Sequence, residues 1–354
     1  MPFVDVNDVR INYVRIPCDA GEDCEDLVMV HGLATNLAFW YFTHAPAFSK
    51  RYRVTLFDLR GHGRSGTTES GYAVANMASD LEQFLDRLGI ERAHFVAHSF
   101  GGAVALNLAC RNPARFASLM VLDTQIHAVR RAGHAGWEFG EQIQRILDQN
   151  KLKIDVTDPC FGYKLLTEAA RLKLENGAIT RELEDMVRPL LGKNSSRTAS
   201  AWLKLIQTTR AGKELMDDDG LSLDKLRKLN FPILAVYGEH SPAMTTGERI
   251  LDAWPQADFR RIRGAGHFFP ITRPDEFMEI CRQFWNGALR DEVPRRRGDS
   301  GKRYFRSDRF YPREGKWFLD TREAPGKGPF DDLNHAKEFF ETQQAGVIAS
   351  GITK

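Results

Sequence analysis

Short apolar runs alternate with helical patterns of apolar residues over residues 1–125, and this alternation restricts the possible folds more than any other feature of the chain. Strands that alternate with helices form a mostly parallel sheet with helices on both faces, so we predict an α/β fold. Apolar residues at helical spacing predict helices over Met77–Leu88 and over Phe100–Arg111, and Pro113 ends the second pattern. The predicted strands are Val9–Ile16, Leu27–Val30, Arg53–Asp58, His94–Val96 and Ser118–Leu122.

Residues 127–225 differ, because they carry helical patterns and no strand-like run. After them the alternation resumes with apolar runs over Pro232–Tyr237 and Phe259–Ile262 and with an amphipathic helix over Pro274–Trp285. A helical block inserted into a sheet that then resumes is typical of a cap over an active site. We therefore predict an α/β core over residues 1–126 and 226–287 and a helical cap over residues 127–225. The predicted cap helices are Trp137–Leu147, Tyr163–Leu174, Arg181–Leu191 and Ala199–Leu215.

The composition changes again after Trp285. Residues 288–303 are rich in arginine and predict a solvated basic linker. Residues 304–354 predict a small α+β module, a β-hairpin with a helix, which holds too few apolar residues for a strong core of its own. Within this module we predict a strand over Lys316–Arg322, a turn over Gly326–Pro329 and a helix over Asp331–Gln344.

Charge and cysteine usage argue against several classes of protein. The formal net charge is +2, from 49 basic and 47 acidic residues, which argues against a nucleic-acid-binding protein. No apolar run is long enough to cross a membrane, and the N-terminus lacks the pattern of a signal peptide. The five cysteines are scattered, which favours reduced thiols, although Cys18 and Cys24 share one loop and could pair if oxidised. We expect a cytoplasmic protein that binds no metal, and the sequence leaves its oligomeric state open.

The run Val96–Gly102, with the sequence VAHSFGG, lies between a predicted strand and a predicted helix. A serine nucleophile on such a turn needs small residues two positions before and after it, because the strand and the helix approach closely there. Gly101 meets that need, and Ala97 adds only one methyl group to it. We predict that Ser99 is a nucleophile.

A second pattern, Val30–Leu33, directly follows a predicted strand. Acyl transfer needs two backbone N–H groups aimed at the oxyanion that develops during the reaction. We predict that these donors are the amides of Leu33 and of Phe100, the residue after the predicted nucleophile.

His267 is the candidate general base. It ends a glycine-rich run, Gly264–His267, between the last predicted strand and the last predicted helix, and imidazole titrates near neutral pH. Of the other histidines, His62 and His98 lie in tight turns beside motifs, and we expect them to be structural.

These motifs, together with Phe57–Ser65 between them, resemble those of the α/β-hydrolase superfamily in its cap-bearing branch of serine hydrolases. The resemblance covers residues 1–287, and the motifs occur in the family's order. It implies a Ser–His–acid triad, no cofactor, and a cap on the substrate side.

The acid of that triad is where the sequence departs from the family. The family's commonest position is a Gly-x-x-Asp pattern after the strand predicted over Pro232–Tyr237, but Ser241 occupies it in this chain. A serine cannot stabilise an imidazolium, and some branches of the family place the acid after the strand that follows the nucleophile's helix. That position is Asp123, which we favour over Glu239.

The resemblance implies a small-molecule acyl substrate. We expect a serine esterase or thioesterase that cleaves a carboxylic ester or thioester through a covalent acyl-enzyme on Ser99. Aromatic residues of the cap are candidates for an apolar substrate-binding site, although such residues are more often core: Trp137, Phe161 and Trp202. Lactone or amide cleavage, a carbon–carbon hydrolase, a perhydrolase, and a catalytically impaired scaffold that binds a ligand or partner stay open as alternatives.

Overall fold

The computed structural model describes residues 2–130, 139–191, 195–254, 257–286, 310–313, 316–319 and 327–331, together with His335 and Phe339. It divides the chain into two compact units, Met1–Arg303 and Tyr304–Lys354. Within the described residues, no helix combines the length and the apolar character that crossing a membrane requires.

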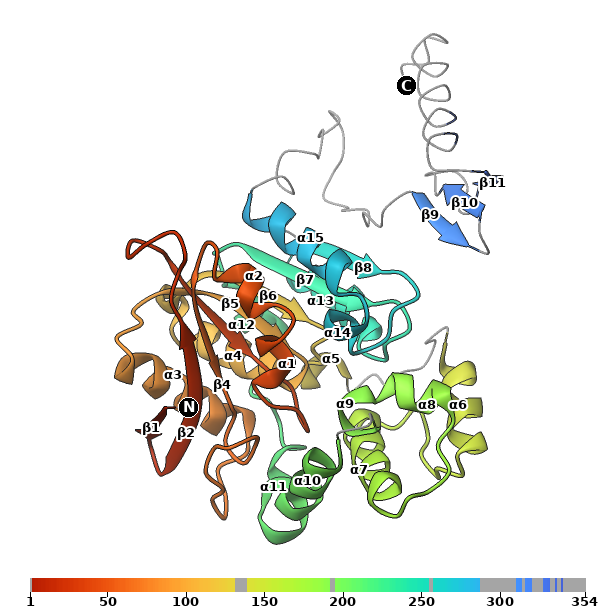
Figure 1. Ribbon diagram of the computed structural model, residues 1–354, viewed down its shortest axis with the longest axis horizontal. Helices are drawn as coiled ribbons and strands as arrows, with labels where there is room; N and C mark the ends of the chain where they lie inside the picture. The colour runs from red at the N-terminus through yellow and green to blue at the C-terminus, as the bar shows by residue number, and fades with distance from the viewer. Residues whose placement is uncertain are drawn as a thin grey trace. The chain divides into compact units, whose positions relative to one another are not determined.

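The first unit is built on an eight-stranded sheet with the strand order β1-β2-β4-β3-β5-β6-β7-β8. β1 and β2 form an antiparallel pair and β2 runs antiparallel to β4, whereas the remaining pairs are parallel. The predicted α/β fold is confirmed, because the sheet is mostly parallel and helices join its strands (Figure 1). The strands are β1 (Phe3–Val6), β2 (Val9–Ile16), β3 (Asp26–Val30), β4 (Arg53–Phe57), β5 (Ala93–His98), β6 (Phe116–Leu122), β7 (Ile233–Gly238) and β8 (Asp258–Ile262).

Helices both connect these strands and form an inserted group between β6 and β7. Within the inserted group, α6 to α11 gather together at one side of the sheet (Figure 1). The inserted helices are α5 (His127–Arg130), α6 (Gly140–Gln149), α7 (Phe161–Leu174), α8 (Arg181–Met186), α9 (Arg188–Leu191), α10 (Ser196–Thr208), α11 (Ala211–Glu214) and α12 (Leu223–Arg227). The other helices are α1 (Ala38–Tyr41), α2 (Ala45–Phe48), α3 (Val74–Arg87), α4 (Phe100–Arg111), the 3-10 turn η1 (Pro113–Arg115), α13 (Met244–Ala253), α14 (Phe269–Thr272) and α15 (Pro274–Trp285).

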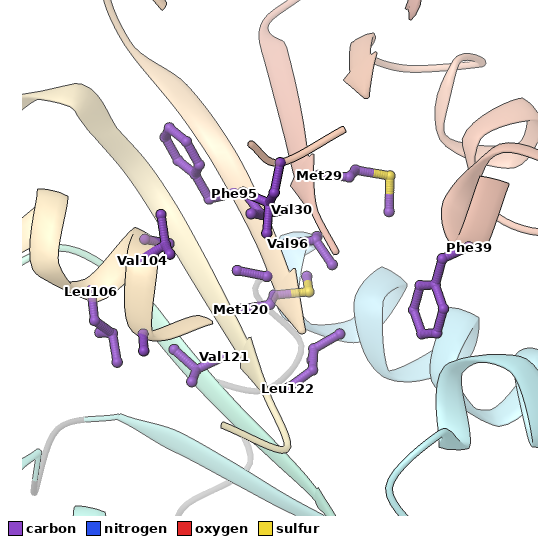
Figure 2. Close-up of a cluster of buried hydrophobic side chains, with 14 of the residues drawn as sticks. Met29, Val30, Phe39, Phe95, Val96, Val104, Leu106, Met120, Val121 and Leu122 are labelled. Atoms are coloured by element: carbon purple, nitrogen blue, oxygen red, sulfur yellow. The ribbon is translucent and has the colours of Figure 1, made fainter. Parts of the chain in front are cut away.

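Strands β3, β5 and β6 form the centre of the sheet and are buried along most of their length, as their nearly continuous apolar sequences require. Figure 2 shows the apolar cluster that joins these strands to α4 and α1. Because this core fixes the carboxyl ends of three neighbouring strands, the loops that follow them start from a rigid edge. The cluster includes Met29, Val30, Phe39, Phe95, Val96, Val104, Leu106, Met120, Val121 and Leu122.

Two predicted cap helices are each divided in the structure. The helix predicted over Arg181–Leu191 ends as α8 at Met186, and α9 begins at Arg188. Pro189 explains the break, because proline has no N–H to donate and its ring clashes with the preceding turn of a continuous helix. The helix predicted over Ala199–Leu215 is likewise divided into α10 and α11.

The second unit contains a three-stranded antiparallel sheet with the order β11-β10-β9. Its strands are β9 (Phe310–Arg313), β10 (Lys316–Leu319) and β11 (Lys327–Phe330). The predicted turn over Gly326–Pro329 is wrong, because β11 pairs there with β10. The basic linker predicted over residues 288–303 and most of the helix predicted over residues 331–344 lie outside the described residues.

Cys18 and Cys24 form a disulfide in the loop between β2 and β3. The expectation of reduced thiols is therefore wrong for this pair. The loop turns back on itself and places the two Cα atoms 6.3 Å apart, which is within reach of a disulfide.

Candidate active site

Ser99 lies on the sharp turn between β5 and α4. Its backbone has φ +56° and ψ −124°, a conformation that a residue other than glycine adopts only where its surroundings impose it. The Ser99 amide donates a hydrogen bond to the Leu122 carbonyl (2.8 Å), which ties the turn to β6. A methyl group at Gly101 would collide with the carbonyl oxygen of His31, so the close approach of helix and loop requires glycine there.

The structure brings Ser99, His267 and Asp123 together. Ser99 Oγ lies 2.9 Å from His267 Nε2, and His267 Nδ1 lies 3.4 Å from Asp123 Oδ2. With the serine hydroxyl donating to Nε2, the proton of the neutral imidazole is on Nδ1 and faces the carboxylate. Asp123 directly follows β6, and His267 lies on the loop between β8 and α14. This chain of contacts is the arrangement that a nucleophile, its base and an orienting acid require.

The Asp123 carboxylate is fully buried next to the end of β7. Its Oδ1 accepts a hydrogen bond from the Gly238 N–H (3.3 Å). Burial raises the pKa of Asp123 well above its usual value, and the Ser241 hydroxyl and the Gly238 N–H oppose that rise.

The His267 ring keeps 27% of its side-chain surface exposed at the wall of a cavity. Its desolvation lowers the pKa of His267 to about 4, so the ring is neutral at pH 7 and can take up a proton. His98 supports the base: its Nε2 donates to the His267 carbonyl oxygen (2.9 Å), and the two ring centroids lie 4.7 Å apart. His98 is itself buried and does not line the cavity, which fits a structural role.

The amides of Leu33 and Phe100 are the candidate oxyanion donors. Among the described residues, neither amide donates a hydrogen bond within the protein, and both residues line the cavity with Ser99. Phe100 is the first residue of α4, where a helix N–H has no acceptor of its own. Both amides are therefore available to an oxygen atom of a ligand beside Ser99.

His31 holds the loop that carries Leu33. Its Nε2 accepts a hydrogen bond from the Leu59 N–H (3.0 Å), so Nδ1 carries the proton and donates to the Gly32 carbonyl (2.7 Å). Burial lowers the pKa of His31 to about 4 and keeps the ring neutral. Sequence reasoning missed this role, although His31 belongs to a motif that it singled out.

Ser99 and His267 line a cavity of about 530 Å³. Helices α6, α7 and α8 contribute part of its wall, and the loops after the strands contribute the rest. Over the part of the chain that the structure describes, no three His, Cys, Asp or Glu side chains are grouped so as to hold a metal ion. The apolar side chains from these three helices are Ile143, Ile146, Phe161, Leu165, Leu166 and Met186.

The three aromatic residues predicted to bind substrate have different positions. Phe161 lines the cavity, whereas Trp137 lies outside the described residues. Trp202 does not line the cavity, which corrects the expectation for this residue. It is 2% exposed because the apolar face of α10 packs inward, and its ring lies against those of Tyr163 and His62, at centroid distances of 5.8 and 6.1 Å.

Glu239, the alternative acid, contacts the loop of His267 rather than its ring. Its Oε2 accepts a hydrogen bond from the Gly264 N–H (2.8 Å), and its Oε1 lies 3.9 Å from Arg261. Asp123 is therefore the carboxylate that faces His267 Nδ1.

Comparison with known families and proteins identifies two segments. A family model described as alpha/beta hydrolase fold matches residues 27–274, which is most of the chain. A second model, a domain of unknown function (DUF6316), matches residues 295–342.

Individual relatives match this chain over very different lengths. A putative carbamate hydrolase RutD of Caulobacter sp. (strain K31) is 38% identical over 287 residues, which cover 78% of this chain and 96% of that protein. The dihydrolipoyllysine-residue acetyltransferase component of the acetoin cleaving system of Cupriavidus necator is 38% identical over 121 residues, covering 34% of this chain and 31% of that protein. This chain therefore spans less than a third of that second relative. Among solved structures, Est816, an N-acyl homoserine lactone degrading enzyme, is 26% identical with a TM-score of 0.55, covering 80% of this chain and 100% of that chain.

Proposed function

The chain belongs to the α/β-hydrolase family of enzymes, and on this premise we propose that it is a serine hydrolase that cleaves a carboxylic ester or thioester through an acyl-enzyme on Ser99. The observation that carries the proposal is the contact chain from Ser99 Oγ through His267 to Asp123 at the wall of a cavity. The amides of Leu33 and Phe100 beside Ser99, which donate no hydrogen bond to any part of the protein that the structure describes, support it.

In the first half-reaction, Ser99 Oγ attacks the carbonyl carbon of the substrate while His267 Nε2 takes the hydroxyl proton. Asp123 stabilises the imidazolium, and the Leu33 and Phe100 amides donate hydrogen bonds to the oxyanion of the tetrahedral intermediate. When the intermediate collapses, the carbon–oxygen or carbon–sulfur bond breaks, and the leaving alcohol or thiol takes the proton from His267.

In the second half-reaction, a water molecule gives a proton to His267 and attacks the acyl-enzyme. Collapse of the second tetrahedral intermediate breaks the bond to Ser99, which regains its proton from His267, and releases the carboxylic acid. These steps use only protein groups and water, so the proposed reaction needs no metal or cofactor.

The cavity supports an apolar acyl substrate of modest size. A volume of about 530 Å³ lies within the range of small-molecule binding sites. Helices α6 and α7 give the cavity an apolar wall that includes Ile143, Phe161 and Leu165, which suits an apolar acyl chain. Charged side chains line other parts of the cavity: Glu182, Asp185, Arg188, Asp217, Asp219 and Arg273. The length of the substrate's acyl chain should therefore affect turnover more strongly than polar substituents on that acyl chain do.

A carbamate or a lactone is the second candidate substrate class. The match to the putative carbamate hydrolase RutD covers 96% of that protein and 78% of this chain, and Est816 is an N-acyl homoserine lactone degrading enzyme. Both compounds present a carbonyl carbon that Ser99 could attack through the same steps.

Turnover of a matched panel tests the proposal and separates these classes. The panel holds p-nitrophenyl esters and coenzyme A thioesters from acetyl to dodecanoyl, an N-acyl lactone and a carbamate, each with wild-type protein and with Ser99→Ala. We expect ester or thioester turnover that rises and then falls with chain length and is lost in Ser99→Ala. Turnover of the carbamate or lactone alone would favour the second candidate, and ester turnover that survives in Ser99→Ala would contradict the proposal.

A further inference from the structure

The candidate nucleophile and its acid follow two neighbouring strands that end level with each other. β5 and β6 are parallel neighbours, and the last residue of β5, His98, pairs with the last residue of β6, Leu122 (Figure 1). Ser99 and Asp123 are therefore the first residues beyond a matched pair of strand ends. Both have positive φ, +56° for Ser99 and +48° for Asp123, which costs energy in a residue other than glycine. Such turns persist only where neighbouring groups hold them.

The residues on either side of Asp123 hold the amide and the carbonyl of Ser99. The Ser99 N–H donates to the Leu122 carbonyl (2.8 Å), and Thr124 Oγ1 donates to the Ser99 carbonyl (3.0 Å). The Leu122 carbonyl lies farther from Thr124 Oγ1, at 3.4 Å, so the Ser99 carbonyl is the nearer acceptor. A carbonyl oxygen can only accept, which fixes the direction of this bond from the hydroxyl to Ser99. The first bond joins backbone atoms, whereas the second requires a hydroxyl side chain at Thr124.

Thr124 is placed to act on Ser99 without touching a substrate. It has no exposed surface and does not line the cavity. It packs against the first turn of α4, where a methyl group at Gly102 would collide with Thr124 Oγ1. The Tyr237 hydroxyl anchors its backbone from the neighbouring strand β7, because it donates to the Thr124 carbonyl (2.9 Å). The Ser99 carbonyl also accepts the Gly102 N–H (2.9 Å), so the turn should still form when the Thr124 hydroxyl is removed.

We propose that Thr124 is a positioning residue whose hydroxyl ties the turn of Ser99 to the end of β6. This tie holds Ser99 Oγ within hydrogen-bond reach of His267 Nε2, at 2.9 Å. A shift of the turn would lengthen the bond through which the proton leaves Ser99, and a misplacement of about 1 Å can cost about a hundredfold in rate. The inference rests on the proposed function for its catalytic consequence, whereas the tie itself can be measured without any substrate.

Thr124→Val is the first test, because valine nearly keeps the shape of threonine and removes the hydroxyl. With the best substrate of the panel, kcat should fall about fivefold, the effect of one hydrogen bond, with KM unchanged because Thr124 does not line the cavity. The rate at which a fluorophosphonate labels Ser99 should fall by the same factor, since that reaction also requires Ser99 Oγ beside His267. Thr124→Ser keeps a hydroxyl and should restore both rates to near the wild-type values.

Thr55→Val is the matched control. Thr55 lies in β4, is fully buried, and its hydroxyl has no hydrogen-bond partner among the described residues. This substitution therefore removes a buried threonine hydroxyl without breaking a hydrogen bond, and both rates should stay at the wild-type values. Equal kcat and equal labelling rates in Thr124→Val, Thr55→Val and the wild type would overturn the proposal, even if Thr124→Val lowered the free energy of unfolding.

Amide hydrogen exchange measures the tie without a substrate. The Ser99 N–H donates to the Leu122 carbonyl, so it exchanges only when the turn opens. In Thr124→Val the Ser99 amide should exchange about fivefold faster relative to the amides of β5, because opening then breaks one hydrogen bond fewer. If Thr124→Val does not fold, Thr124→Ala removes the same hydroxyl without placing a methyl group against the Ser99 carbonyl, and the same changes are expected of it. Unchanged exchange of the Ser99 amide would contradict the proposal.

Failure of this inference can be told from failure of the proposed function. If a fluorophosphonate does not label wild-type protein, Ser99 is not activated and the proposed function fails, whereas hydrogen exchange still decides whether Thr124 holds the turn. If Ser99 is labelled and neither the labelling rate nor the exchange of the Ser99 amide changes in Thr124→Val, only the inference about Thr124 fails.

Discussion

Acid should destabilise this protein steeply, because two neutral histidines are buried beside the candidate site. The rings of His31 and His62 lie 5.5 Å apart, and burial lowers the pKa of each to about 4. A proton on His31 Nε2 would remove the acceptor of the Leu59 N–H. His62 Nδ1 donates to the Arg60 carbonyl (2.9 Å), and its Nε2 has no hydrogen-bond partner in the structure described, so a second proton would be a buried, unsatisfied donor.

The size of the effect follows from proton linkage. An unfolded histidine titrates near pH 6.5, so between pH 6.5 and about 4 the unfolded chain binds a proton that the native ring does not. Stability is therefore fully present above this window and is lost as the pH falls through it. The loss is about 2 kcal/mol per histidine at pH 5 and reaches about 3 kcal/mol below pH 4.

Urea unfolding at pH 7.5 and pH 5.0, followed by circular dichroism, measures this loss for His62. His62→Asn keeps a side-chain N–H that can reach the Arg60 carbonyl but cannot be protonated. The wild type should lose about 2 kcal/mol more than His62→Asn between the two pH values, because all other groups titrate alike in both proteins. An equal loss in the two proteins would show that His62 takes up its proton in the native state and would refute the reasoning.

Three further predictions concern the acid, the turn of Ser99 and the domain boundary. Asp123→Asn should lower kcat by about four orders of magnitude, because the amide favours the wrong tautomer of His267. Glu239→Gln keeps an acceptor for the Gly264 N–H, and its kcat should stay within a few-fold of the wild-type value. If Glu239→Gln instead lost more activity than Asp123→Asn, Glu239 would be the acid. Gly101→Ala should destabilise by about 1–3 kcal/mol in urea unfolding, because its methyl group meets the His31 carbonyl, and an unchanged midpoint would contradict that contact. Deletion of residues 288–354 should leave a folded protein with wild-type turnover, and insoluble or inactive protein would show that the core extends past α15.

Elements with a strong local signal were predictable from the sequence. β2, α4 and α15 have the predicted bounds, and prolines mark the ends of two of these: Pro113 follows α4, and Pro274 begins α15. The central strands were predictable as apolar runs, although their ends differ by one or two residues because sheet pairing, rather than hydrophobicity, sets them.

Features that depend on distant residues were not predictable to the same degree. The sequence left Asp123 and Glu239 both open, because only the packing of the strand-end loops decides which carboxylate faces His267. Trp202 is an aromatic residue of the cap, as a binding residue could be, but the tertiary packing of α10 buries it away from the cavity.

The central claim is that Ser99 is an activated nucleophile. Incubation with a fluorophosphonate, followed by intact-mass and peptide mass spectrometry, tests it without knowledge of the substrate, because only an activated serine reacts at a useful rate. The account predicts one adduct per chain, on the peptide that contains Ser99, absent in Ser99→Ala and formed far more slowly in His267→Ala. Unlabelled wild-type protein, or an adduct on another residue that persists in Ser99→Ala, would contradict it.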